Sequence, residues 1–226
     1  MRVECLLLTL SLGLLAGAPV FAQSGPPPGG VPGSPQALAQ LARSLKQPKP
    51  IVTINRPQAK TTGKLTVTSA TLGASGIFPV INTGYGKSIS PQVSWTAGPT
   101  GTASYMLIME DGTAGRNREG VLHWLMFNLP PGTTSLAEGA APPPPTRMGA
   151  NMEGKTVYSG SHAPVGGPPF HYHIQVFALD RMPDLPAGAS RHDVWAAIDR
   201  HVLAAGEVIG EFQGPSVAAF QAAQGH

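Results

Sequence analysis

The chain has 226 residues and a formal net charge of +3, and only 12% of its residues are charged. Its Lys and Arg residues are dispersed and form no run, so nucleic-acid binding, which needs a basic patch, has little support. With Cys5 as the only cysteine, the sequence excludes an internal disulfide, an iron–sulfur cluster and a zinc site built on several cysteines.

The first 22 residues have the pattern of a secretory signal peptide. Arg2 gives the n-region its positive charge, and the apolar run Cys5–Leu15 is too short to cross a bilayer as a stable helix. Val20–Ala22 offers a cleavage site before Gln23; an uncleaved anchor is the alternative. We expect residues 1–22 to be removed, which leaves a periplasmic or secreted protein with no thiol and no integral membrane segment.

Residues 23–50 are predicted to be a flexible segment. Eleven of the twelve residues Ser24–Pro35 are Pro, Gly or Ser, which is the composition of a spacer. Three leucines on one face of Gln36–Lys46 indicate a short helix that packs weakly on the domain or stays detached. The folded domain is expected over residues 51–214, followed by a tail over residues 215–226.

The domain itself has a β pattern. Short apolar or alternating segments are separated by Pro- and Gly-rich turns, which favours a sandwich. The predicted strands are Lys64–Ser69, Gln92–Thr96, Ser104–Glu110, Val121–Leu129, His171–Asp180 and Val208–Phe212.

One helix is clear near the C-terminus. Ser190 and Asp193 form a capping box, and the apolar residues Val194, Ile198 and Val202 follow at four-residue spacing. A glycine at position 206 would end the helix. We therefore predict an all-β fold, a sandwich of two antiparallel sheets with one or two peripheral helices near the C-terminus.

Alternation along the strands selects candidate functional residues, because alternate side chains share a face. His123 shares a predicted face with Val121, Leu125 and Phe127. In the strand that starts at His171, that residue shares a face with His173 and Gln175. The opposite face of this strand, which begins with Tyr172, has the composition of core.

A carboxylate completes the candidate cluster. Asp111 follows a buried strand and lies in a predicted glycine-containing turn. A carboxylate beside imidazoles can fix their tautomer and raise their pKa, so such a cluster could bind a phosphate-sized anion. Each histidine alone could equally be a structural residue, and periodicity does not say where the residues meet.

Five segments resemble, in order, motifs of the phosphatidylethanolamine-binding protein family, in particular its bacterial Raf-kinase-inhibitor-like branch. They correspond to the family's Ser-Pro-x-Leu-x-Trp, Asp-Pro-Asp-Ala-Pro, His-Trp-x-x-x-Asn-(Leu/Ile)-Pro and Tyr-x-Gly-Pro stretches and to its bacterial C-terminal strand. The segments are Ser90–Trp95, Leu107–Ala114, His123–Pro130, Tyr158–Gly160 and His201–Phe212.

The resemblance implies a small cavity that accepts phosphate-like anions and phospholipid headgroups. It places Asp111 on the first Asp of Asp-Pro-Asp, His123 on the family's histidine twelve residues later, and His171 on the histidine of His-Arg-Tyr. In this alignment Tyr172 replaces the Arg and His173 replaces the Tyr, which adds a third imidazole to the expected pocket.

We therefore interpret the chain as an exported binding protein and not an enzyme, with Asp111, His123, His171 and His173 as ligand-binding residues and no cofactor. The resemblance also implies a protein partner, for which a protease is a better candidate than a cytosolic kinase. Two alternatives stay open. One is a metal-dependent hydrolase in which the same four residues hold a divalent metal, and the other is an interaction protein with a vestigial pocket.

Overall fold

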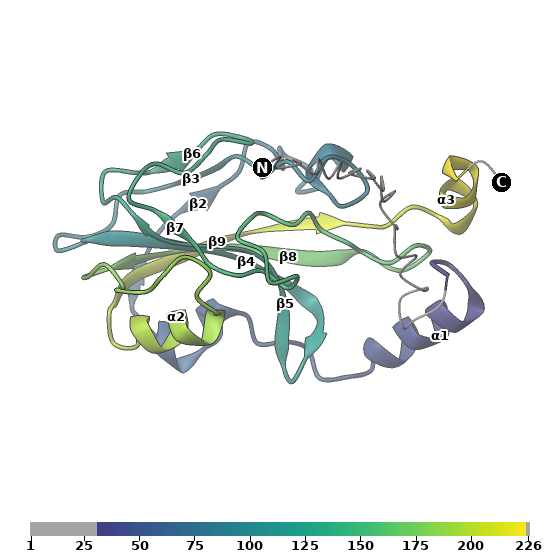
Figure 1. Cartoon of the computed structure of the whole chain (residues 1–226), viewed down its shortest axis with the longest axis horizontal. Coiled ribbons are helices and arrows are strands. Elements are labelled where there is room, and N and C mark those ends of the chain that lie inside the picture. Colours follow the sequence, from purple (N-terminus) through teal and green to yellow (C-terminus); the bar gives the residue numbers. More distant parts are fainter. Residues whose placement is uncertain (1–30, 225–226) are drawn as a thin grey trace, which may run out of the picture.

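The structure is a computed structural model that describes residues 31–224 of the chain. Its strands form a six-stranded and a three-stranded sheet (Figure 1). In the order of the first sheet the strands are β1 (Gly63–Lys64), β9 (Val202–Phe212), β8 (Phe170–Leu179), β4 (Ser104–Arg116), β5 (Glu119–Leu129) and β7 (Arg147–Met148). The second sheet contains β2 (Val67–Thr68), β3 (Val93–Trp95) and β6 (Ser135–Leu136).

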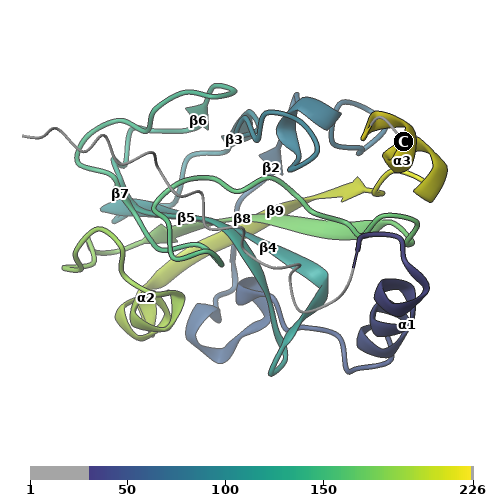
Figure 2. The same cartoon turned by 45° about the vertical axis from the view of Figure 1, so that its right-hand side comes forward.

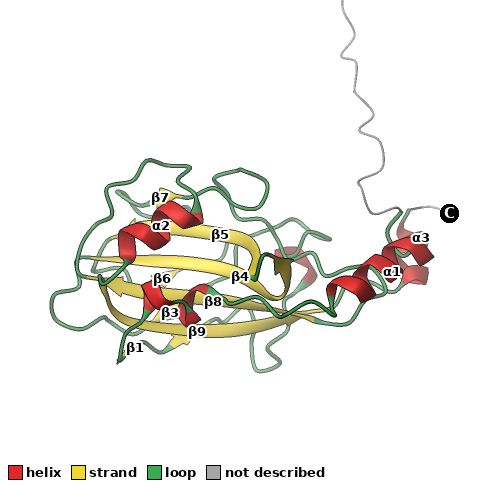
Figure 3. Cartoon of the chain, turned by 90° about the horizontal axis from the view of Figure 1, so that it is seen from below, coloured by secondary structure: helices red, strands yellow, loops and turns green. Residues whose placement is uncertain are grey.

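The described part of the chain also contains three α-helices, α1 (Pro35–Ser44), α2 (Arg191–Ile198) and α3 (Val217–Ala223). Figure 3 shows α1 and α3 close together at one end of the molecule and α2 toward the other. No helix within residues 31–224 is long and apolar enough to span a bilayer. The predicted signal peptide, residues 1–22, lies outside the described residues.

The larger sheet is not purely antiparallel, so the prediction of two antiparallel sheets is wrong at one edge. β1 pairs with β9 in parallel, with Gly63 opposite Ala204, whereas every other pair of named strands is antiparallel. The short β1 pairs with Ala204 and Ala205 and so covers part of the outer edge of β9, which limits pairing with other chains there.

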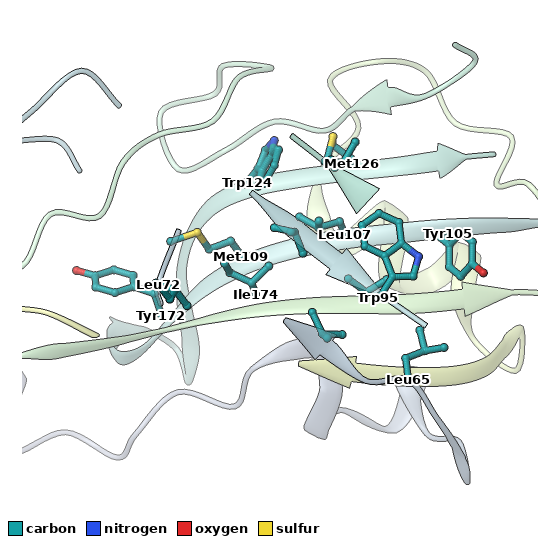
Figure 4. Close-up of a cluster of buried hydrophobic side chains, with 14 of the residues drawn as sticks. Leu65, Leu72, Trp95, Tyr105, Leu107, Met109, Trp124, Met126, Tyr172 and Ile174 are labelled. Atoms are coloured by element: carbon teal, nitrogen blue, oxygen red, sulfur yellow. The ribbon is translucent and has the colours of Figure 1, made fainter. Parts of the chain in front are cut away.

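Two clusters of buried side chains cover the two faces of the larger sheet. The first cluster takes residues from both sheets; the Trp95 ring of β3 meets Tyr105 of β4 edge to face, with 5.6 Å between ring centroids. Figure 4 shows this cluster running from Trp95 to Tyr172. The second cluster is covered by α2, whose buried residues are Val194, Trp195 and Ile198.

The helix α2 begins as predicted but ends early. Ser190 accepts from the Asp193 backbone amide in a complete capping box, yet the helix stops at Ile198 and β9 begins at Val202. Gly206, predicted to stop a helix, lies inside β9. A Cβ atom there would come within 2.1 Å of the Leu65 carbonyl oxygen, so the glycine permits close approach of the neighbouring backbone.

The predicted turn after Glu110 is also absent. The chain continues as β4 to Arg116, and the hairpin turns at Asn117 and Arg118, whose φ angles are 53° and 59°. Two successive residues with positive φ are typical of a type I′ hairpin turn. Asp111 therefore lies within a strand, at an irregular stretch where the register between β4 and β5 shifts.

Segment 31–50 contacts the domain through one side of α1. Ser34 caps α1 through a hydrogen bond from the Ala37 backbone amide, and no residue of α1 is fully buried. Leu41 nevertheless packs against the first core cluster. The predicted helix at 36–46 is therefore present and rests on the domain; the flexibility of segment 23–50 stays a prediction.

Candidate functional site

The register between β4 and β8 divides the candidate residues between two faces of the sheet. Asp111 lies opposite Tyr172, and Glu110 lies opposite His173. Side chains directly opposite one another in an antiparallel pair point to the same face. Asp111 and Tyr172 therefore share the face of the first core cluster, and Glu110 and His173 share the other.

His123 reaches the Asp111 face through a β-bulge. In the β4–β5 pairing, Met109 lies opposite Trp124 and Glu110 lies opposite Leu122, which leaves His123 as the extra residue. An extra residue of this kind shifts the alternation of the strand and re-aims the side chain.

The bulge corrects the predicted face of β5. The His123 ring meets the Tyr172 ring edge to face, with 5.2 Å between centroids. Leu125 and Phe127, predicted to share its face, belong to the core cluster on the opposite side of the sheet. Strict alternation fails here because it cannot anticipate where a bulge occurs.

His123 is held as a neutral, oriented imidazole. It is 2% exposed, and its Nδ1 lies 2.9 Å from the Ser159 carbonyl oxygen. Because a carbonyl can only accept, Nδ1 carries the proton in the neutral ring and Nε2 is the acceptor. Burial lowers the His123 pKa to about 4, with a smaller contribution from the charge of His162, while the Ser159 carbonyl raises it in part.

Asp111 is a buried carboxyl with a raised pKa. Its Oδ1 accepts hydrogen bonds from the backbone amides of Thr113 at 2.7 Å and Ala114 at 3.2 Å. Burial raises the Asp111 pKa to about 7; the two amides and the charge of His173 oppose this shift. Near neutral pH part of the population is therefore the neutral acid, which can donate a hydrogen bond.

Tyr172 is a neighbour of both groups: it lies opposite Asp111 in the β4–β8 pair, and its ring meets the His123 ring. Its side chain is fully buried, and its hydroxyl has no well-formed hydrogen bond with the described residues, although the His162 backbone is close enough to act on its pKa. Burial, reinforced by the charge of Asp111, raises the Tyr172 pKa. Buried hydroxyls normally have a partner, so this one is a donor left without an acceptor.

Two neighbouring tyrosines are already satisfied. The Tyr158 hydroxyl donates to the Asn82 carbonyl at 2.7 Å, and the Tyr85 hydroxyl donates to the Ala163 carbonyl at 2.8 Å. Their hydrogen bonds hold the segment after β7 against the segment after β2. Tyr172 differs from both because its hydroxyl donates no hydrogen bond to the described residues.

His171 and His173 do not join this cluster, which corrects the prediction that they converge with Asp111 and His123. Both point to the opposite face, where carboxylates of β9 face them. His173 Nδ1 lies 2.8 Å from Glu207 Oε2, and the exposed His171 has its Nε2 3.5 Å from Glu211 Oε2. The physical reason is that alternate residues of β8 point to opposite faces of the sheet. Because Tyr172 faces the first core cluster, His171 and His173 on either side of it face away.

The predicted metal set is therefore not assembled. Asp111 and His123 lie on one face of the sheet, and His171 and His173 on the other. Within residues 31–224 no group of three His, Cys, Asp or Glu side chains is arranged to hold a metal ion. The geometry gives no support to the hydrolase alternative in the form that the sequence suggested.

Sequence reasoning missed Tyr172, which was assigned to the core. A His-x-Tyr motif places its first and third residues on one face, and the face of Asp111 carries Phe170 and Tyr172. Shifting the family match by one residue therefore puts Tyr172 on the tyrosine and Phe170 on the histidine. The signal was present in the sequence as a hydroxyl-bearing residue in an otherwise apolar core stripe.

Comparisons with known proteins agree with this architecture. Residues 57–213 match the family model described as phosphatidylethanolamine-binding protein. This stretch is more than half of the chain, and the chain therefore belongs to the phosphatidylethanolamine-binding protein family.

Several relatives extend the likeness. The chain is 35% identical over 132 residues to a UPF0098 protein of Methanothermobacter thermautotrophicus, covering 57% of this chain and 85% of that protein. It is 27% identical over 150 residues to LppC of Mycobacterium tuberculosis, named as a candidate lipoprotein, covering 66% and 73%.

Two solved structures show the same fold. A candidate phosphatidylethanolamine-binding protein homologue from Chlamydia trachomatis superposes with a TM-score of 0.61 at 26% identity, over 67% of this chain and 99% of that one. Escherichia coli YbcL superposes with a TM-score of 0.60 at 24% identity over 67% and 99%.

Proposed function

We propose that the chain is an exported binding protein whose pocket, formed by Asp111, His123 and Tyr172, takes a phosphate-like anion or a phospholipid headgroup. His171 and His173 are no longer part of this proposal. We further infer that the two sheets pack as a sandwich, because both supply residues to the first core cluster, and that the pocket lies where β4 and β8 leave that cluster.

The single observation that carries the proposal is the buried Tyr172 hydroxyl, whose proton has no acceptor among residues 31–224. A buried hydroxyl without a partner costs about 1–3 kcal/mol. A ligand oxygen that accepts from Tyr172 would recover this free energy. Stability alone favours phenylalanine at this position, so the hydroxyl is best explained by a ligand.

The neighbouring groups fit a phosphate that also carries a donor. Neutral Asp111 and Tyr172 can donate to phosphate oxygens. His123 Nε2 can accept from the P–OH of a monoester, or from the ammonium or hydroxyl of a headgroup. Ionised Asp111 repels an anion, so affinity should strengthen as the pH falls through about 7, the pKa of Asp111.

We also propose that the protein is exported and that it binds a partner protein. The relative named as a candidate lipoprotein in Mycobacterium tuberculosis supports a location in the cell envelope, together with the predicted signal peptide. In that compartment an exported protease could be a partner, whereas a cytosolic kinase could not.

A pair of tyrosine substitutions tests the pocket. Tyr172→Phe should lower the affinity for inorganic phosphate and for glycerophosphoethanolamine at pH 6 by about tenfold, or about 1.4 kcal/mol, while the fold becomes equally or more stable. The control is Tyr105→Phe, whose hydroxyl accepts from the Gly98 amide at 2.7 Å. This control should lose stability and keep its affinity, both measured by calorimetry. Unchanged affinity in Tyr172→Phe would place the ligand elsewhere.

A further inference from the structure

An apolar loop borders the candidate pocket. In the segment between β2 and β3, Ile77 is 53% exposed, Val80 is 57% exposed and Ile81 is 40% exposed. Between and beside them, Phe78 and Asn82 are buried. The loop thus turns two residues inward and presents three large aliphatic side chains outward.

The inward residues form part of the wall around Tyr172. The Phe78 ring meets the Tyr172 ring edge to face, with 5.9 Å between centroids, and the Asn82 carbonyl accepts from the Tyr158 hydroxyl at 2.7 Å. The Phe78 amide donates to the Glu211 carbonyl of β9 at 2.9 Å. These contacts place the three outward side chains, defined here as the aliphatic patch (Ile77, Val80, Ile81), on the outer side of the pocket wall.

The two segments that form the pocket wall contain no carboxylate of their own. Residues 70–90 contain no Asp or Glu and one cation, Lys87, which is exposed. The other wall segment, residues 156–170, also contains no Asp or Glu. Carboxylates from other segments reach this region: Glu138 accepts from Thr71 at 3.0 Å, Glu153 accepts from Ser159 at 3.1 Å, and Glu211 pairs through its backbone with Ile77.

Two helices at the same end add little charge. α3 has no charged residue, and the charged residues of segment 31–50 are all basic, Arg43, Lys46 and Lys49. Figure 2 shows the segment between β2 and β3 at the end of the molecule where α3 lies. An apolar loop that has no carboxylate of its own matches the interface of a membrane better than water.

We propose that the aliphatic patch inserts into the interface of a phospholipid bilayer and holds the pocket against its headgroups. This proposal rests on the proposed function in one respect, namely that a lipid headgroup is the ligand. Shallow insertion of an apolar face into the headgroup region gives binding that scales with the buried apolar area.

Size and composition favour a bilayer over a second copy of the chain. A stable protein interface buries about 800 Å² on each partner, far more than three half-exposed aliphatic side chains provide. Protein interfaces are also enriched in Tyr, Trp and Arg, none of which is in the patch. A fluid bilayer needs neither a large area nor shape complementarity.

The test compares vesicle binding with headgroup binding. The combined variant I77S/V80S/I81S should bind vesicles of phosphatidylethanolamine and phosphatidylglycerol at least about tenfold more weakly than the wild type in flotation assays. Its affinity for inorganic phosphate should be unchanged. The matched control is Met182→Ser, which removes a 42% exposed apolar side chain beyond the other end of β8 and should leave vesicle binding intact.

Equal vesicle binding by I77S/V80S/I81S and the wild type would overturn the proposal. So would a wild-type dimer that becomes monomeric in the variant without loss of vesicle binding, because the patch would then be a self-association surface. If the combined variant does not fold, Val80→Ser alone should weaken vesicle binding about threefold, and no change would overturn the proposal.

The two proposals fail in different ways. If the wild type binds vesicles through the patch but shows no affinity for phosphate or glycerophosphoethanolamine, membrane docking stands and the headgroup pocket is wrong. If it binds the soluble headgroup but not vesicles, the pocket stands and docking is wrong.

Discussion

Glu110 and Asp111 are neighbours in the chain and are both buried, yet they lie in opposite kinds of environment. Glu110 faces the α2 side of the sheet, where it accepts from the Thr53 amide at 2.7 Å and from the Gln175 side chain at 3.0 Å. It also pairs with Arg191 at 3.1 Å.

Asp111 faces the other side, where its hydrogen-bond partners among the described residues are two amides of its own segment. The Glu110 network compensates a buried charge almost completely, as folded proteins generally require. The Asp111 site leaves a carboxyl and the Tyr172 hydroxyl undercompensated. The first arrangement is that of a structural network, and the second is typical of a site that a ligand completes.

The largest expected effect tests the structural side of this comparison. Glu110→Ala should destabilise the fold by about 3–5 kcal/mol, because it leaves the mostly buried Arg191 charge and the Thr53 amide without their partner. Urea unfolding at pH 7 measures this loss. Glu119→Ala is the control, because Glu119 contacts the same Arg191 at 3.5 Å but is 22% exposed, and it should cost about 1 kcal/mol or less. A smaller loss for Glu110→Ala than for Glu119→Ala would contradict the contrast.

The next effect has the opposite sign. Asp111→Asn should stabilise the fold above pH 7, because the asparagine is never ionised and can still accept from Thr113 and Ala114. The rise in the Asp111 pKa from 3.8 to about 7 corresponds to a free-energy cost of about 4 kcal/mol for burying the ionised form. In the wild type this contribution is absent below pH 3.8 and grows as the pH rises to about 7.

The buried His123 has the reverse pH dependence. Its pKa falls from 6.5 to about 4, so the unfolded chain binds a proton between these values that the folded chain excludes. Its contribution to stability is therefore full above pH 6.5 and is lost as the pH falls toward 4. In the wild type the Asp111 contribution to stability falls with rising pH while the His123 contribution rises, so the two oppose each other. In Asp111→Asn the His123 slope should stand alone, with stability rising from pH 4 to pH 6.5 in urea unfolding; a flat profile would contradict the assigned environments.

Much of the fold could be predicted from the sequence. The long strands β4, β5 and β8 carry strong apolar patterns, and the capping box at Ser190 fixed the start of α2. The end of α2 was missed because Val202–Phe212 contains small and apolar residues whose helical and strand patterns overlap. This segment is a strand because it pairs with β8 from Leu179 opposite Val202 to Phe170 opposite Phe212, and such long-range pairing leaves no local signal.

The candidate site was half predictable for a related reason. Asp111 and His123 were found through sequence motifs, which can be recognised although β4 is irregular after Glu110 and β5 has a bulge at His123. His171 was chosen because the family's His-Arg-Tyr motif was matched one residue too late, and His173 was added because it shares a face with His171. The register between β8 and β4 places Tyr172, and not a histidine, on the face of Asp111. This register depends on tertiary structure and cannot be read from β8 alone.

The smallest expected effect tests that correction directly. His171 is exposed, its side chain lies 3.5 Å from Glu211, and its backbone amide donates to Thr113 Oγ1 at 2.8 Å. His171→Ala keeps the backbone amide and removes a weak surface pair, so stability should change by about 0.5 kcal/mol or less. Affinity for inorganic phosphate should stay within about twofold of the wild type.

His123→Ala is the matched comparison for His171→Ala, because it removes the same ring from the other face of the sheet. It takes away the Nε2 acceptor and leaves a cavity beside Tyr172, so phosphate affinity should fall by about tenfold or more. Calorimetric titration of both variants at pH 6 separates the two faces. If His171→Ala weakens phosphate binding as much as His123→Ala does, the ligand must also contact the face of the sheet that carries His171. The assignment of His123 and His171 to separate faces, only one of which binds the ligand, would then be wrong.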